Sequence, residues 1–485
     1  MKKIAISALV LGLAYVGGAY FTGYLGEQKM REQLALSQAQ SASSGLIMVL
    51  EHYERGIFSS DVALTLKSAN SLALFNNNME VSVNTQLQHG PVLFKQGFGL
   101  GLFSAITRIM VHTHDADTDK KITDFFGESI GEIYTQAGFS NTYTARWLLP
   151  AKKVEEGSYN LSFAESSVDM QGRFDSLSTK GEIHLGAMEL LSADGSEVKM
   201  SPAEGSFDST NLAAGINIAN ANIHVDEINI TTAAGVKLFV KQLGYEQKQS
   251  VVNESIDTSV ALTLAEVSGP VSASNAYYKV DMNQLNIAAL KAWGEGMSVL
   301  PSDPLALNTF YMEQLKRLAP QFLQPGLSFT FAMGADFMGG KPQAHWTLSY
   351  QPPAAGTNVA DMSEPFEYLS LADSQLEVRL PEVVAMGLPM LTLMDSYITK
   401  EAGEYVLKAT LHNSELFVGD TQIPTETVLM VLSGIGAKQN AAQDAQLQQT
   451  IDSADDEDDE DDEDDEDEEM DDELEEESAG SAAAE

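Results

Sequence analysis

The sequence predicts an α+β fold that is mostly β: an extended antiparallel β-rich body with packed helices, after one N-terminal transmembrane helix. Three observations lead to this prediction. Residues 4–25 form a run of 22 residues without a charge. From Leu46 onward, many short runs alternate apolar and polar residues, which is typical of strands that bury one face. Only a few segments show apolar residues at helical spacing.

The uncharged run predicts a membrane anchor. At about 1.5 Å per residue it can cross a hydrocarbon core of about 30 Å. Lys2 and Lys3 precede it, whereas the charges that follow it sum to zero, so the N-terminus is expected in the cytoplasm and the body on the far side. A cleavable signal peptide with a small-residue site near 16–19 is the alternative. The run is longer than a signal h-region of about 7–15 residues, which favours a retained anchor.

Small residues recur within the anchor. Ala14, Gly18, Thr22 and Gly26 follow each other at every fourth position. Because small residues at this interval let two helices approach closely, the pattern indicates a homodimer through the transmembrane helix, although such residues are also common in single spans.

The chain is expected to divide into four segments: a cytoplasmic stub and transmembrane anchor (1–25), a stalk helix or linker (26–45), a β-rich domain on the far side of the membrane (46–437), and a linker with a disordered acidic tail (438–485). Helical spacing predicts helices over 118–137, 305–318 and 426–432, and over 381–398, where Pro389 should kink or split the helix. Alternation predicts strands over most of the remaining body and a closing hairpin over 405–423.

Charge and cysteine content exclude several classes of function. The net charge is −42, and removing the 23 acidic residues of 452–485 leaves −19 for residues 1–451. An acidic body argues against a nucleic-acid partner. The chain has no cysteine, which excludes disulfides, cysteine-ligated zinc and thiol nucleophiles. The tail cannot bury enough apolar surface to order itself; it is expected to be a solvated tail, with attraction of a basic partner or divalent cations as the alternative.

Two short motifs are the strongest candidates for a site, and their residues are Tyr53, Arg55, Gly56, Phe58, His89, Gly90 and Pro91. The structural interpretation is preferred: residues 54–57 form a hairpin loop in which Gly56 supplies positive φ, and Arg55 pairs with a sheet carboxylate. His89 would then cap or pack at a turn that ends a strand. In the functional interpretation, Tyr53 and Arg55 bind a lipid phosphate or a partner's carboxylate.

The segment Tyr53-Glu54-Arg55-Gly56-Ile57-Phe58-Ser59-Ser60, followed about thirty residues later by His89-Gly90-Pro91, resembles the YdgA-like bacterial family of unknown function. With the anchor and the closing hairpin, the resemblance covers roughly residues 1–433. It implies an inner-membrane-anchored protein of Gram-negative bacteria that faces the periplasm, with no assigned activity and no known catalytic residues. The acidic tail departs from the family pattern.

Metal and catalytic motifs are weak or absent. His112 and His114 could share a metal ion if both lie on one strand, but a strand-to-helix loop capped by Asp or Thr explains this stretch better. The acidic residues that follow lack the glycine and the final glutamate of a calcium loop. No His-Glu-x-x-His, Gly-x-Ser-x-Gly or phosphate-binding loop is present, and no catalytic residue or cofactor is predicted.

These observations favour a non-enzymatic cell-envelope protein, exposed to the periplasm, that binds lipid or an envelope client in an apolar trough on its sheet. Two alternatives stay open: an envelope hydrolase with a site assembled from distant loops, and a scaffold that binds envelope proteins through its sheet edge. A continuous apolar trough would favour the first hypothesis, and convergent His, Asp or Ser side chains in a cleft would favour a hydrolase.

Overall fold

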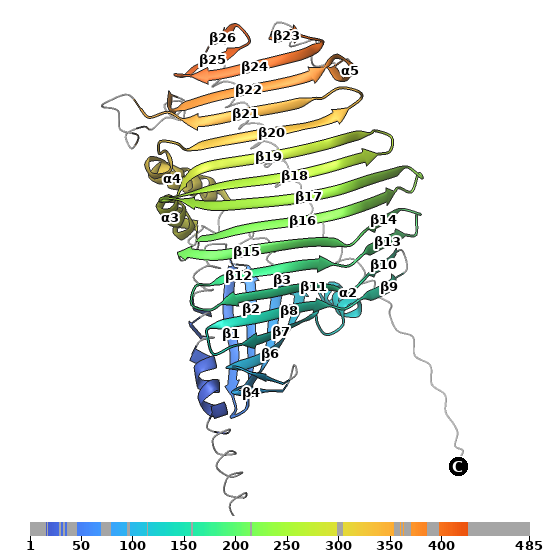
Figure 1. Cartoon of the computed structure of the whole chain (residues 1–485), viewed down its shortest axis with the longest axis vertical. Coiled ribbons are helices and arrows are strands. Elements are labelled where there is room, and N and C mark those ends of the chain that lie inside the picture. Colours follow the sequence, from blue (N-terminus) through green and yellow to red (C-terminus); the bar gives the residue numbers. More distant parts are fainter. Residues whose placement is uncertain are drawn as a thin grey trace, which may run out of the picture. The chain divides into compact units, whose positions relative to one another are not determined.

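An antiparallel ladder of strands forms most of the protein in a computed structural model (Figure 1). The structure describes residues 46–68, 79–94, 98–113, 115–156, 159–213, 216–297, 304–353, 370–385 and 397–424, together with 16, 18–28, 31, 32, 34, 35, 359 and 362. The chain divides into two units, residues 1–423 and 424–485. All elements given below belong to the first unit.

The longest described strands, of 14 to 16 residues, follow one another between residues 216 and 286. Their bounds are β1 Leu46–Arg55, β2 Ser59–Ser68, β3 Met79–His89, β4 Val92–Leu93, β5 Gly99–Leu100, β6 Phe103–Thr113, β7 Glu132–Ala137, β8 Thr142–Leu149, β9 Lys152–Glu156, β10 Tyr159–Phe163, β11 Ser166–Arg173, β12 Ser178–Leu185, β13 Met188–Ser192, β14 Glu197–Met200, β15 Ala203–Ala213, β16 Ile216–Thr231, β17 Lys237–Val252, β18 Ser255–Ser268, β19 Ala273–Asn286, β20 Ser328–Phe337, β21 Gln343–Tyr350, β22 Ala372–Pro381, β23 Ile398–Glu401, β24 Glu404–His412, β25 Glu415–Val418 and β26 Thr421–Ile423.

Strand pairing follows the chain closely. The ladder runs β1–β2–β3–β6–β7–β8–β11–β12–β15–β16 and continues β16–β17–β18–β19–β20–β21–β22–β24. A branch of β9, β10, β13 and β14 joins β16 beside β15, and β23 and β25 pair with successive parts of β24. Each pair among the described strands is antiparallel, as the alternating pattern and short turns predict.

Helices are few among the described residues. The N-terminal helix (residues 18–28, with helical positions out to 35) precedes the sheet. Three of the others are α2 Ala116–Phe126, α3 Ile287–Met297 and α4 Pro304–Phe322; α3 and α4 contact each other and β19 (Figure 1). The short α5 Glu382–Ala385 follows β22. Within the described part of the chain, no helix is long and apolar enough to cross a membrane.

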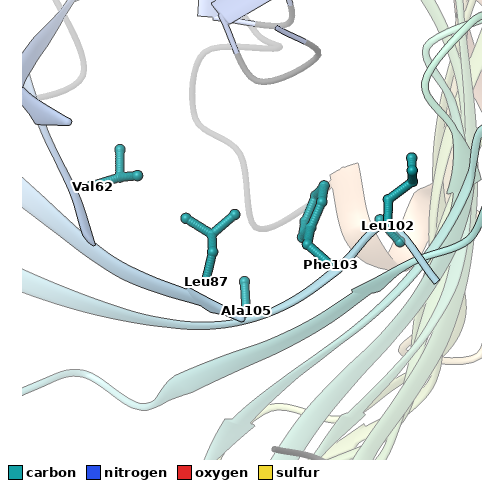
Figure 2. Packing of buried hydrophobic residues seen from close by; sticks show 6 residues of the cluster. Val62, Leu87, Leu102, Phe103 and Ala105 are labelled. Atoms are coloured by element: carbon teal, nitrogen blue, oxygen red, sulfur yellow. The ribbon is translucent and has the colours of Figure 1, made fainter. Parts of the chain in front are cut away.

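A small buried core lies where the N-terminal helix meets the first strands. It consists of Val62, Leu87, Leu102, Phe103, Ala105 and Ala137. Figure 2 shows five of these side chains, those of Val62, Leu87, Leu102, Phe103 and Ala105, on the inner side of the curved strands. Leu25 of the N-terminal helix packs against this cluster. The helix therefore contributes to the fold of the body.

The predicted fold class is confirmed as mostly β, with an antiparallel sheet and few helices. The transmembrane helix stays a prediction, because its first residues lie outside the described part of the chain. The helix predicted over 118–137 is wrong in its second half. It ends at Phe126, because Gly127 and Gly131 adopt positive φ, and Ile133 lies on β7.

Other elements agree more closely with the prediction. A helix begins at Pro304 and the closing hairpin turns at Asn413, which has φ of 51°. Of the helix predicted over 381–398, the structure shows only the short α5 at its start, and Ile398 at its end belongs to β23. Residues 386–396 lie outside the described part of the chain. The predicted helix over 426–432 and the acidic tail lie outside the described residues.

Candidate functional site

The two sequence motifs meet at one end of the sheet. The first motif covers the end of β1, the turn 56–58 and the start of β2, and His89 is the last residue of β3. The backbone N–H of His89 donates to the carbonyl oxygen of Phe58 at 2.8 Å. Residues thirty positions apart therefore form one group, called here the motif cluster: Tyr53, Arg55, Gly56, Phe58, Ser60, His89, Gly90 and Pro91.

A buried hydrogen-bond chain joins the centre of the motif cluster. His89 Nδ1 lies 3.0 Å from the carbonyl oxygen of Ile57, and His89 Nε2 lies 2.8 Å from Ser60 Oγ. A carbonyl can only accept, so Nδ1 carries the proton and Nε2 accepts from the Ser60 hydroxyl. Tyr53 is in turn hydrogen-bonded to Ser60. His89 and Ser60 are only 2% and 1% exposed, so these bonds satisfy groups that water cannot reach.

Burial also sets the protonation of the cluster. Burial lowers the pKa of His89, with a smaller contribution in the same direction from Arg55; the hydrogen bond to Ile57 and the charge of Glu27 act in the opposite direction. Burial likewise raises the pKa of Tyr53. Both side chains are therefore neutral at pH 7, which is the state that the hydrogen-bond chain requires.

Arg55 connects the cluster to the N-terminal helix. Its guanidinium lies 3.1 Å from a carboxylate oxygen of Glu27, and stacks over the rings of Tyr20 and Tyr24 at 5.2 and 5.8 Å. Arg31 of the same helix lies over the ring of Tyr53 at 5.1 Å. Arg55 therefore pairs with a carboxylate of the N-terminal helix and not, as the sequence predicts, with a carboxylate on the sheet. Charge and cation–π contacts thus hold the helix on the cluster.

The small residues of the N-terminal helix face the body of the same chain. A Cβ at Gly23 would lie 2.3 Å from His89 Nδ1, and one at Gly18 would lie 3.1 Å from Pro91 Cδ. Ala19 and Thr22, between them, are buried. Over residues 18–26 the small-residue stripe is therefore occupied by the sheet. Dimerisation through the preceding residues stays a prediction.

The glycines of the motifs allow close backbone approach. Gly90 lies so near the Gly101 carbonyl that a Cβ would lie 1.8 Å from its oxygen. The expectation that Gly56 supplies positive φ is wrong: Gly56 is not among the residues with positive φ, and its N–H closes the turn on the Ser59 carbonyl at 2.7 Å. The loop is also shorter than expected, because β1 extends to Arg55.

The Ser60–His89 pair differs from a hydrolytic dyad in two respects. Both side chains are buried, so a substrate carbonyl has no access to Ser60 Oγ. The second imidazole nitrogen faces the Ile57 carbonyl, whereas hydrolases place a carboxylate there to stabilise the imidazolium. The pair serves to fix the turns of the cluster.

The metal-like stretch forms a capped helix start. His112 lies on β6, and Asp115 accepts from the Thr118 N–H at 3.2 Å at the start of α2. This confirms the expected strand-to-helix loop. His114 lies outside the described residues, so its pairing with His112 stays a prediction. No group of three or more metal-ligating side chains occurs in the described part of the chain.

An apolar row crosses seven neighbouring strands of the sheet. Strand register places its members directly opposite one another: Tyr245, Leu262, Tyr278, Met333, Ala344, Val378 and Leu407. Directly opposite residues project from the same face. At about 4.8 Å between strands, the row extends about 29 Å across the sheet.

The apolar row lines a hollow. A cavity of about 510 Å³ lies over Leu262, Tyr278 and Met333, which are 42, 42 and 46% exposed. A second cavity of about 370 Å³ lies over Met282, Phe329 and Leu348, which are opposite one another on the same strands. The same face carries both cavities, and they are called here the trough.

The opposite face of these strands is polar. Lys279 pairs with Asp281 at 2.9 Å, and Lys241 pairs with Glu266 at the same distance. The period-two pattern thus separates charged and apolar side chains across the sheet. Neither Tyr278 nor Met333 was predicted as a site residue; the sequence signal for them is the alternation of apolar residues at 278, 280 and 282 and at 329, 331 and 333.

Comparisons with known proteins confirm the family that the two motifs predict. Residues 1–453 match the model of a family described as bacterial protein of unknown function (DUF945), and the chain belongs to this family. It is also similar to Protein YdgA of Escherichia coli (strain K12), with 23% identity over 267 residues. The match covers 52% of this chain and 52% of that relative, so the chain spans about half the length of the relative. No solved structure matches.

Proposed function

We propose that this protein is a non-enzymatic cell-envelope protein that is anchored in the bacterial inner membrane and binds lipid acyl chains in the trough. The observation that carries the proposal is the apolar row. Three of its large side chains, Leu262, Tyr278 and Met333, are partly exposed side by side in register. Large apolar surfaces of this kind on a soluble sheet mark binding sites.

The dimensions of the trough fit acyl chains. Half of a hydrocarbon core of about 30 Å is about 15 Å, so the apolar row, at about 29 Å, is longer than one acyl chain. Each buried CH₂ contributes about 0.8 kcal/mol. The cavities of about 510 and 370 Å³ fall within the range of small-molecule pockets, about 300–1,000 Å³. An envelope client protein is the second candidate occupant of the trough, because its apolar side chains would make the same kind of contact as an acyl chain.

Native mass spectrometry of the full chain, purified in detergent, tests lipid binding. We expect retained phospholipid on the wild type and its loss on Met333→Lys, which places a charge in the middle of the row. Losing about 1.5 kcal/mol of apolar contact weakens binding about tenfold. Thr330→Lys is the matched control, because Thr330 lies on the opposite face of the same strand, opposite Asp281. Equal lipid on both variants, or none on the wild type, would refute trough binding.

The anchor is supported by the uncharged run of residues 4–25. The end of this run rests on the body, with Gly18 beside Pro91 and Gly23 beside His89, so the part that would enter the membrane lies before Gly18. A periplasm-active reporter fused after Ala437 should be active, and the protein should stay with membranes after high-salt washing. Release of a soluble form that begins near Ala19 or Tyr20 would contradict anchoring.

A further inference from the structure

Several turns lie in one row at the end of the sheet that carries the motif cluster. Register places Ser59 opposite Gln88, Gln88 opposite Ser104, and Ser104 opposite Gln136. The β1–β2 turn, the segment between β3 and β6, and the β7–β8 turn therefore share one edge. The helix reaches the same edge, since Gly18 lies beside Pro91.

Large apolar side chains are exposed on each of these segments. Phe98 is 80% exposed, and Phe21, Phe94 and Phe139 are between 56 and 59% exposed. Phe58 and Tyr20 are exposed as well. These six residues are called here the aromatic rim. Phe94 and Phe98 contact each other, with ring centroids 6.1 Å apart.

The charge of the rim segments differs from that of the chain. The described rim segments, residues 56–60, 89–94, 98–103 and 138–142, contain no aspartate, glutamate, lysine or arginine, although the chain carries a net charge of −42. Acidic turns, such as Asp194 between β13 and β14, occur elsewhere. Exposed aromatic side chains without neighbouring acidic residues are typical of protein surfaces at the bilayer interface.

The N-terminal helix has a matching division of faces. Its small residues lie on the sheet, whereas Tyr20, Phe21 and Tyr24 are exposed. The helix continues the uncharged run that begins at Ile4, and it enters the body at the edge where the aromatic rim lies. The described end of the run, residues 18–25, and the rim therefore lie at the same edge of the sheet.

We propose that the aromatic rim is a bilayer-docking surface, which seats this end of the sheet in the headgroup region of the membrane. The inference rests on the proposed anchoring and is independent of lipid binding in the trough. Docking would hold β1–β8 at the membrane surface and fix the strand stack relative to it, because three turns and a helix contact the bilayer together.

Depth-dependent quenching on the full chain tests the proposal. Because the chain has no cysteine, Phe98→Cys creates a single attachment point for an environment-sensitive fluorophore. The matched control is Val271→Cys, an apolar residue that is 57% exposed in the β18–β19 turn, far along the ladder from the rim. Both labelled chains are reconstituted in phosphatidylethanolamine–phosphatidylglycerol vesicles, with and without lipids that carry a nitroxide near the headgroup.

We expect the label at position 98 to shift to the blue and lose most of its fluorescence with nitroxide lipid, while the label at position 271 changes little. Vesicle flotation reports the anchor separately. If the chain floats with the vesicles but both labels are quenched equally, the proposal that the rim docks on the bilayer is wrong, whereas the proposed anchor stands. A chain that does not float overturns both. A disulfide-linked dimer of unlabelled Phe98→Cys, without quenching, would show that a second copy covers the rim and would also overturn the proposal.

Discussion

Replacing Ser60 by alanine removes one hydroxyl from the centre of the motif cluster. The substitution leaves the backbone and volume of β2 nearly unchanged, but His89 Nε2 loses its partner at 2.8 Å and Tyr53 loses its own. A buried polar group left without a partner costs about 1–3 kcal/mol. Because Ser60 and His89 are almost fully buried, water cannot replace the lost bond, and the cost should fall within this range.

The predicted loss should be local. Hydrogen exchange reports the free energy of local opening, and 1–3 kcal/mol corresponds to about 5- to 150-fold faster exchange. Mass spectrometry of peptides from the exchanged full chain measures this acceleration. We expect it in peptides from β2 and β3, and little change in peptides from β17–β20. Ser59→Ala is the matched control, since Ser59 is the exposed neighbour on the same strand.

The reasoning fails if Ser60→Ala accelerates exchange of β2 and β3 no more than Ser59→Ala does. That result would mean that the hydrogen-bond chain contributes no net stability. Acceleration spread evenly over all strands would contradict the local role, because it would indicate global unfolding.

Three further predictions follow from the same end of the sheet and from α2. Burial lowers the pKa of His89 below 6.5, so the unfolded chain binds a proton before the folded chain does as the pH falls. The local stability of β3 should therefore be constant above about pH 6.5 and decline below it. Hydrogen exchange at pH 7.5 and 5.5 should show that this decline is smaller in His89→Gln than in the wild type. Gly23→Leu should displace the N-terminal helix from His89, measured as faster exchange of residues 18–28 than in Phe21→Leu. Asp115→Ala should destabilise α2 by about 1 kcal/mol, measured as faster exchange in α2, because it removes the cap on Thr118.

Each of these has a clear contrary outcome. An identical pH dependence in wild type and His89→Gln would show that His89 does not titrate on unfolding. Equal exchange of the helix in Gly23→Leu and Phe21→Leu would show that Gly23 does not contact the sheet. Unchanged exchange in α2 after Asp115→Ala would show that Asp115 is not its cap.

Local pattern was enough to predict the antiparallel sheet and the closing hairpin, because the period of two is a property of each strand by itself. It also predicted that His89 ends a strand. It failed over 118–137, where apolar residues at 122, 126, 130 and 133 fit a helix until the positive φ of Gly127 and Gly131 is considered. The prediction for Gly56 also failed, because a glycine in a turn does not require positive φ; here a Cβ would lie only 3.1 Å from the Ser59 carbonyl oxygen.

The sequence by itself determined which residues share a face of each strand, the uncharged run of 4–25 and the location of the charge. The tertiary structure decided which strands lie next to each other and in what register, and only register brings Leu262, Tyr278 and Met333 side by side. It also decided that Gly23 rests on His89 and that Glu27 pairs with Arg55. These contacts join residues 16 to 66 positions apart, and no local spacing encodes them, because they depend on how the whole sheet twists and where the helix lies on it.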